Sequence, residues 1–124
     1  VDEPDTPRPL LTLSEFFDGN SAVGSIGCNL SPAPEPAAFR KVLEEIAARP
    51  EVADVRVQVS MFDDPDWPFS DTVWVLTSAL ADTVASWFPE DLRPDDVFVG
   101  WPTDDPVEAC AVPPGTQPVG CWWD

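Results

Sequence analysis

The clearest pattern of hydrophobic and polar positions lies in the segment 31–50. Prolines at its start suit a helix entry, where the first N–H groups need no intrahelical partner, and Pro50 ends the pattern. Between them, four apolar residues recur at the spacing i, i+3, i+4 and i+7 of an amphipathic helix: Phe39, Val42, Leu43 and Ile46. The spacing therefore predicts a helix whose charged residues face solvent.

The residues after Pro50 change to strict alternation. Val55, Val57, Val59 and Met61 alternate with Asp54, Arg56, Gln58 and Ser60, which predicts a strand with one wet face. Shorter apolar runs predict strands at 22–30, 71–77, 95–101 and 119–124. A second helix is predicted within 78–90, with Ser78 as its cap and an apolar stripe of Leu80, Val84, Trp87 and Phe88. A short helical turn is predicted between Ser14, as N-cap, and Gly19.

The predicted order is β-α-β-β-α-β followed by one more strand. This order matches the ferredoxin-like βαββαβ pattern, and it predicts an α+β, two-layer sandwich with a mainly antiparallel sheet and two helices on one face. A mixed sheet with another strand order is the alternative. Residues 1–10, rich in proline and charge, are expected to be an extended or disordered lead-in, and residues 11–124 a single α+β domain.

Two adjacent tryptophans stand almost at the end of the chain. In a strand, Trp122 and Trp123 must point to opposite faces because the side-chain period is two, and Cys121 shares the face of Trp123. One indole is therefore expected in the core and the other on the open side of the sheet. There it is either covered by loops or exposed as an anchor for a partner.

Charge narrows the classes of partner. The 124 residues include six basic and 23 acidic ones, for a net charge of −17. Such a surface disfavours direct binding to nucleic acid or to an anionic membrane. Three explanations of this acidity stay open: solubility alone, binding to a basic protein partner, or adaptation to high salt.

The residue inventory removes most catalytic mechanisms. Histidine is absent, and the only lysine, Lys41, lies on the expected solvent face of the first helix. The three cysteines are sparse and form no CxxC pair; Cys28 and Cys121 are expected to be buried, Cys110 is the most accessible, and a Cys110–Cys121 disulfide stays open. We therefore predict no catalytic residues, no metal site and no cofactor. Whether the protein is an enzyme stays open, and the inventory favours a non-enzymatic role. Without an apolar run of membrane-spanning length or a visible leader, we expect a cytoplasmic protein of undetermined oligomeric state.

Acidic loops that keep an aromatic residue close to their carboxylates are the candidate site. Aromatic anchors with steering charges are typical of protein interfaces, although aspartates also suit turns for local reasons. The loops lack the spacing of an EF-hand. The predicted partner-binding face comprises Asp63, Asp64, Asp66, Trp67, Asp95, Asp96, Trp101, Asp104 and Asp105.

These features favour a small acidic, non-enzymatic protein-binding domain that engages a basic partner through Asp- and Trp-rich loops. One version is an immunity or inhibitor-type protein that occludes a nuclease-like toxin. The alternative is a small-ligand domain or carboxylate-based hydrolase with a Trp-lined pocket. A further alternative is an accessory subunit that buries its open sheet face in an oligomer.

Overall fold

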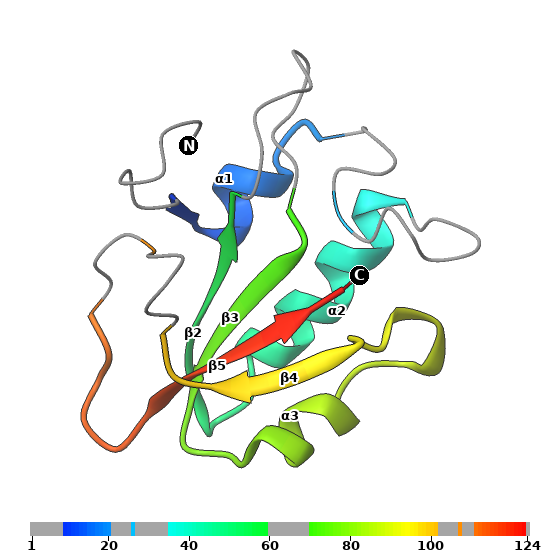
Figure 1. The fold of residues 1–124 in the computed structure, drawn as a ribbon. Coiled ribbons are helices and arrows are strands. Elements are labelled where there is room, and N and C mark those ends of the chain that lie inside the picture. The colour runs from blue at the N-terminus through cyan, green and yellow to red at the C-terminus, as the bar shows by residue number, and fades with distance from the viewer. Residues whose placement is uncertain are drawn as a thin grey trace.

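The computed structural model describes residues 9–20, 26, 35–59, 70–101, 107 and 111–123, and Figure 1 shows their arrangement. They form a small α+β domain built on a five-stranded antiparallel sheet, which confirms the predicted class and the antiparallel sheet. The strands are β1 (Leu10–Leu11), β2 (Val52–Gln58), β3 (Thr72–Thr77), β4 (Asp96–Val99) and β5 (Gln117–Trp122). The helices are α1 (Leu13–Phe17), α2 (Pro36–Ala47), α3 (Ala81–Ser86) and the 3₁₀ turn η1 (Glu90–Leu92).

Helix α2 confirms the predicted amphipathic stripe. Phe39, Leu43 and Ile46 are buried, and Val42 packs half-buried against the same core. Pro36 occupies the first helical position, where its missing N–H costs nothing. The 3.6-residue period was sufficient to place this helix because its buried face is uninterrupted.

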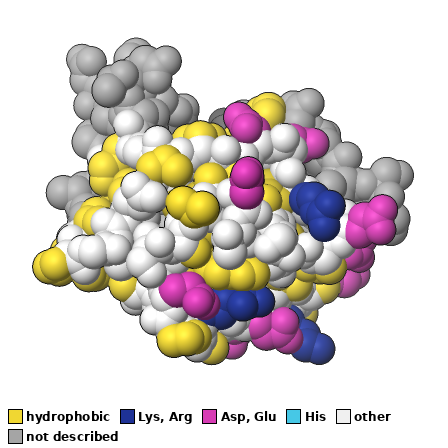
Figure 2. All heavy atoms as spheres, turned by 90° about the horizontal axis from the view of Figure 1, so that it is seen from below, with side chains coloured by type: hydrophobic (Ala, Val, Ile, Leu, Met, Phe, Trp, Pro, Cys, Tyr) yellow, Lys and Arg dark blue, Asp and Glu magenta, His cyan; other side chains and the backbone are white. Residues whose placement is uncertain are grey.

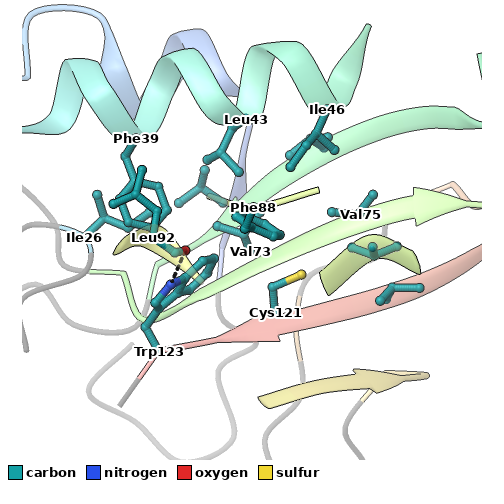
Figure 3. Packing of buried hydrophobic residues seen from close by; sticks show 14 of the residues in the cluster. Ile26, Phe39, Leu43, Ile46, Val73, Val75, Phe88, Leu92, Cys121 and Trp123 are labelled. Carbon is teal, nitrogen blue, oxygen red and sulfur yellow. Dashed lines mark hydrogen bonds between the residues drawn. The ribbon is translucent and has the colours of Figure 1, made fainter. Parts of the chain in front are cut away.

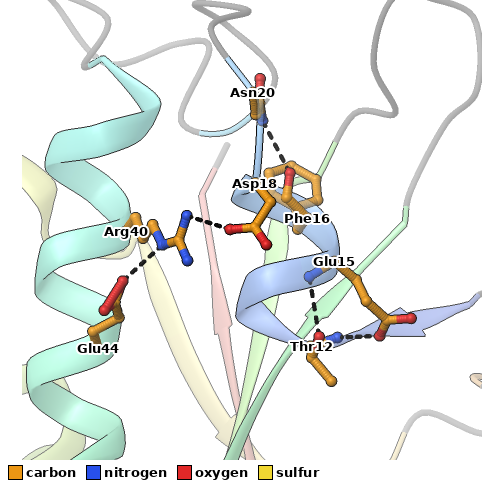
Figure 4. A network of polar contacts seen from close by, with 7 residues as sticks. All are labelled: Thr12, Glu15, Phe16, Asp18, Asn20, Arg40 and Glu44. Carbon is orange, nitrogen blue, oxygen red and sulfur yellow. Dashed lines mark hydrogen bonds and ion pairs between the residues drawn. The ribbon is translucent and has the colours of Figure 1, made fainter.

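Helix α1 begins two residues earlier than predicted. Its N-cap is Thr12 rather than Ser14, and a capping box closes the first turn, as Figure 4 shows. The Thr12 N–H donates to Glu15 Oε1 at 2.8 Å, and the Glu15 N–H donates to Thr12 Oγ1 at 3.1 Å. The hydrogen bond from the Thr12 backbone lowers the pKa of the Glu15 carboxyl below its ordinary value of 4.5. The Thr-x-x-Glu sequence is a known signal for a helix start, and the prediction overlooked it.

Helix α3 corrects two further predictions. Its N-cap is Leu80 rather than Ser78, and the Leu80 side chain is 71% exposed although it was assigned to the buried stripe. Leu80 has extended backbone angles, φ −74° and ψ 156°, so helical periodicity does not set the direction of its side chain. Val84 and Phe88 are buried as predicted, and Trp87 is half-buried with the Arg49 guanidinium 4.4 Å from its ring centroid.

The strand order differs from the predicted ferredoxin-like order. The described order is β1-β2-β3-β5-β4, so the C-terminal strand lies between β3 and β4 and runs antiparallel to both. The predicted first strand, 22–30, lies outside the described residues except for Ile26, which forms an isolated parallel bridge with Ser70. The apolar, small residues of β5 suit a central position because two neighbouring strands cover them. The two-layer sandwich stays a prediction for the chain as a whole.

One hydrophobic core joins the helices to the sheet, as Figure 3 shows. Alternate residues of the strands, such as Val73, Val75 and Cys121, point toward the buried side chains of α2. Trp123 is 2% exposed and lies edge-on to Phe39 at a centroid distance of 5.0 Å. The prediction that Trp123 and Cys121 share the core face is confirmed.

None of the described helices is long and apolar enough to cross a lipid bilayer.

Candidate binding surface

The structure describes three of the nine predicted partner-binding residues. Asp95 and Asp96 are exposed and lie at the start of β4, while Trp101 follows the end of this strand and is half-buried. Five residues of extended chain span about 16 Å, so Trp101 and Asp96 stand at opposite ends of β4. The remaining six residues lie outside the described part of the chain: Asp63, Asp64, Asp66, Trp67, Asp104 and Asp105.

Trp101 belongs to a packed aromatic cluster on the sheet face opposite the core. Its ring lies 4.6 Å from that of Trp74 at an interplanar angle of 51°, and the Trp74 ring lies edge-on to Phe98 at 5.4 Å. Trp74 is 1% exposed, and its indole N–H donates to Gln58 Oε1 at 2.9 Å. Trp101 therefore covers a buried neighbour with part of its surface, in addition to any contact with a partner.

Gln58 also corrects the prediction of a fully wet face on β2. Its side chain is only 6% exposed, because cross-strand packing covers the second face of the sheet as well. Every residue of β3 is buried, on both faces. The alternation of valines and polar residues predicted the strand correctly, but it carried no information about what lies over the polar side.

Gly120 makes close packing of this cluster possible, and the sequence analysis did not single it out. A Cβ at this position would stand 2.6 Å from Phe98 Cε2 and Cζ and 3.0 Å from Trp74 Cζ3. Because Phe98 and Gly120 are opposite each other in the pairing of β4 with β5, the ring crosses directly over the glycine. The aromatic cluster thus requires the absence of a side chain at position 120.

Trp122 points to the same side of the sheet as this cluster. It stands opposite Thr72 on β3 and Asp96 on β4, and it is half-buried. This confirms that the two adjacent indoles face opposite sides of the sheet. Trp122 lies beside an exposed carboxylate, which is the combination of aromatic and acidic groups predicted for the binding face.

Exposed carboxylates gather along the segment that leads into β4. From α3 to the first residue of β4, five acidic residues and one basic residue, Arg93, are exposed; the acids are Asp82 in α3 and Glu90, Asp91, Asp95 and Asp96 after it. Figure 2 shows the molecule from the side on which α3 lies, and acidic side chains outnumber basic ones on this face. Only the charges of the described residues enter this comparison.

Three ion pairs of the described residues lie on α2 and β2. Arg40 on α2 contacts Asp18 at 2.8 Å and Glu44 at 2.7 Å, as Figure 4 shows, and Arg56 contacts Asp54 at 2.7 Å. The hydrogen bond to Asp18 raises the pKa of the Arg40 guanidinium above its ordinary value. The five carboxylates of Asp82, Glu90, Asp91, Asp95 and Asp96 are exposed, so they contribute negative potential at this surface.

The described thiol has no catalytic character. Cys121 is a free, buried cysteine, and burial raises the pKa of its thiol to about 12. A thiol with this pKa is protonated at neutral pH and behaves as a small hydrophobic group. Cys28 and Cys110 lie outside the described residues. Within the described part of the chain, no three acidic or cysteine side chains converge as metal ligands.

A groove follows the outer face of α2 and contains no tryptophan. Its lining consists of Ala37, Arg40, Lys41, Glu44, Glu45 and Ala48. These residues repeat along one side of a single helix, so the groove is a shallow feature between long charged side chains. It differs from the Trp-lined pocket of the small-ligand alternative, which stays a prediction.

Comparison with known proteins gives a family without an assigned activity. A family model described as the Uncharacterized protein YfbO family matches residues 1–121. A protein of Escherichia coli (strain K12), named Uncharacterized protein YfbO, is 48% identical over 124 residues, covering 100% of this chain and 89% of the relative. No solved structure matches the chain.

Proposed function

The chain belongs to the Uncharacterized protein YfbO family, and we propose that it is a non-enzymatic protein-binding domain whose acidic surface engages a basic partner. The surface consists of the exposed carboxylates from α3 to the start of β4: Asp82, Glu90, Asp91, Asp95 and Asp96. The observation that carries the proposal is that all five carboxylates are exposed, while Arg93 is the one exposed basic residue among the described residues 82–96.

Exposed apolar groups accompany this charge. Val99, at the far end of β4, is 51% exposed, and Leu80, which precedes α3, is 71% exposed. Protein interfaces combine a few apolar contacts, which supply binding energy, with charges that steer association and select the partner. Leu80 is the N-cap of α3 and Asp82 lies in the first turn of this helix, so an exposed apolar side chain is close in sequence to one of the carboxylates.

The described carboxylates specify the sign of the partner's charge and not its identity. An immunity or inhibitor-type protein, as predicted from the sequence, is one member of this class. The packing of Trp101 against Trp74 counts against a ligand pocket built on that face of the Trp101 ring, because Trp74 already occupies it.

The test compares two variants that remove the same charge at different places. Glu90→Gln with Asp91→Asn removes two charges from the proposed surface, and Glu35→Gln with Glu45→Gln removes two from α2 and its N-cap. Partners are captured from a lysate of the native host at low salt, released by a salt step and identified by mass spectrometry. Association rates are then measured with the purified partner over a range of ionic strength.

The expected result is a basic protein whose association slows for the first variant and is unchanged for the second. The salt dependence of the rate should also become shallower for the first variant, because fewer charges steer the encounter. Equal association rates for wild type and both variants would contradict the proposal and would leave solubility as the explanation of the acidic surface.

A further inference from the structure

Strand β4 ends the sheet among the described strands, since β5 is its described partner. The Gly100 N–H donates to the Pro118 carbonyl at 2.9 Å, in the same register as the strand pairs. Because hydrogen-bonded pairs alternate along an antiparallel ladder, the peptide groups of Phe98 face β5 and those of Val97 and Val99 point away from it.

The two outward N–H groups, of Val97 and Val99, differ in whether a described hydrogen-bond acceptor satisfies them. The Val97 N–H donates to Oδ1 of Asp96 at 3.0 Å, so a side chain covers this part of the edge. The structure gives no described acceptor for the Val99 N–H, and the Val99 side chain is 51% exposed. Val99 therefore presents an open backbone donor and an apolar side chain at the same position, which is what strand addition uses.

The two sides of β4 differ in chemistry. Val97 and Val99 stand opposite Cys121 and Val119, whose side chains belong to the core, so their side chains lie on the helix side of the sheet. Asp96 and Phe98 alternate with them and lie on the other side. One side of the edge is thus apolar, and the other presents a carboxylate and an aromatic ring.

Leu80 adds to the apolar side. Thr77, three residues before Leu80, pairs with Gln117, and Val99 pairs with Val119, two residues further along β5. The segment that leads into α3 therefore starts at the same end of the sheet as Val99. With the Leu80 side chain 71% exposed, this end carries the two large exposed hydrophobic side chains of the described residues.

We propose that the free edge of β4 binds an extended segment of a basic partner by strand addition. Apolar side chains of the segment contact Val99 on the helix side, and lysine or arginine side chains alternate with them to meet Asp96 and the Phe98 ring. This inference rests on the proposed function, since it uses the acidic surface to define the charge of the partner. It adds the partner's conformation and its alternating pattern.

The experiment uses blocked synthetic hexapeptides and the full chain. The first peptide alternates lysine and valine, the second alternates glutamate and valine, and the third repeats the first with N-methyl groups on the amides that would face β4. Backbone amide spectra record which resonances shift, and titration gives the dissociation constants. The lysine peptide should shift Val99 and its neighbours in β4, and the glutamate peptide should not bind.

The methylated peptide tests the backbone pairing without changing the protein. It should bind about fivefold more weakly for each hydrogen bond removed. Equal affinity of the methylated and unmethylated peptides would overturn strand addition, as would shifts confined to α2. A concentration-dependent dimer in light scattering that protects the Val99 amide would assign the edge to a second copy and also overturn the proposal.

A pair of protein variants gives an independent reading. Val99→Pro removes the outward N–H, which β5 does not use, whereas Val99→Thr keeps this N–H and a β-branched side chain. The proline variant should lose peptide binding and the threonine variant should keep it, with circular dichroism establishing that both are folded. Full binding by a folded proline variant would refute the edge as the site.

Failure of this inference is distinguishable from failure of the proposed function. If peptides do not bind β4 but partner association still depends on Glu90 and Asp91, the acidic surface binds a folded face instead of an extended segment. If neither depends on these groups, both proposals fail.

Discussion

Replacing Trp123 with phenylalanine tests why a large side chain stands one residue before the end of the chain. The Trp123 indole N–H donates to the Leu92 carbonyl at 3.0 Å, and its ring packs edge-on against Phe39 and Phe88 at 5.0 and 5.4 Å. Figure 3 shows the indole lying beneath these side chains, with the hydrogen bond directed to Leu92. Phenylalanine keeps an aromatic ring there but removes the donor.

The expected loss of unfolding free energy is the sum of two effects. A buried carbonyl that loses its donor costs about 1–3 kcal/mol. The smaller ring leaves a volume of about 40 Å³, which at about 24 cal/mol per Å³ costs about 1 kcal/mol more. We therefore expect Trp123→Phe to lower the free energy of unfolding by about 2–4 kcal/mol.

The neighbouring tryptophan is the matched control. Trp122→Phe makes the same chemical change one residue earlier, on the opposite face, where the side chain is half-buried and no described residue accepts a hydrogen bond from it. A loss below about 1 kcal/mol is expected for this variant.

The assay is equilibrium unfolding in guanidinium chloride followed by far-ultraviolet circular dichroism. Each variant keeps five of the six tryptophans, but the tryptophan that is lost has a different environment in each variant. The fluorescence baselines therefore differ between the variants, and circular dichroism avoids this difference. Unchanged m-values would attribute the shift in midpoint to stability. Equal losses for the two variants, or a larger loss for Trp122→Phe, would refute the assignment of the two indoles to opposite faces.

Three further predictions concern single groups. Gly120→Ala should destabilise the domain by about 1–3 kcal/mol in thermal unfolding, because its Cβ would overlap the Phe98 ring; Phe98→Leu should relieve part of this loss, and additive effects would contradict the contact. Because the folded-state pKa of Glu15 is lowered, its contribution is present above its ordinary pKa of 4.5 and is lost as the pH falls through the folded value. The difference in unfolding free energy between wild type and Glu15→Gln should shrink over that acidic range, and a difference constant with pH would argue against the capping box. Thr12→Ala, expected to cost about 1 kcal/mol at neutral pH, should weaken this dependence without abolishing it, because the backbone N–H of residue 12 still donates to Glu15. The Cys121 thiol, with its pKa raised to about 12, should resist iodoacetamide at pH 8 in the folded protein and react after denaturation, as measured by peptide mass spectrometry; rapid labelling of the folded protein would show that the thiol is accessible.

Sequence patterns located most of the described elements because their signals are local. The stripe on α2 and the alternation on β2 each depend on residues within a few positions of one another. The Trp122 and Trp123 pair followed from the same local geometry, since a strand cannot place adjacent side chains on one face. Local rules failed at Leu80, where the helix begins one residue later than its apolar pattern suggests.

The candidate surface was only partly foreseeable. Asp95 and Asp96 were selected for their charge, and both are exposed as expected. Trp101 was selected as an anchor, but packing against Trp74 could not be read from residues that lie 27 positions apart in the chain. The open edge at Val99 was missed because a strand's hydrophobic pattern does not reveal how many neighbours the strand has.

By itself, the sequence determined the α+β class, the faces of α2 and β5, and the acidic charge from which a basic partner is proposed. The tertiary structure decided that β5 inserts between β3 and β4, that Gly120 lies under the Phe98 ring, and that β4 is the edge strand among the described strands. The physical reason is the separation along the chain of the residues that each property depends on. Side-chain periodicity and charge are properties of neighbouring residues, whereas strand order and burial depend on contacts between segments far apart in the chain.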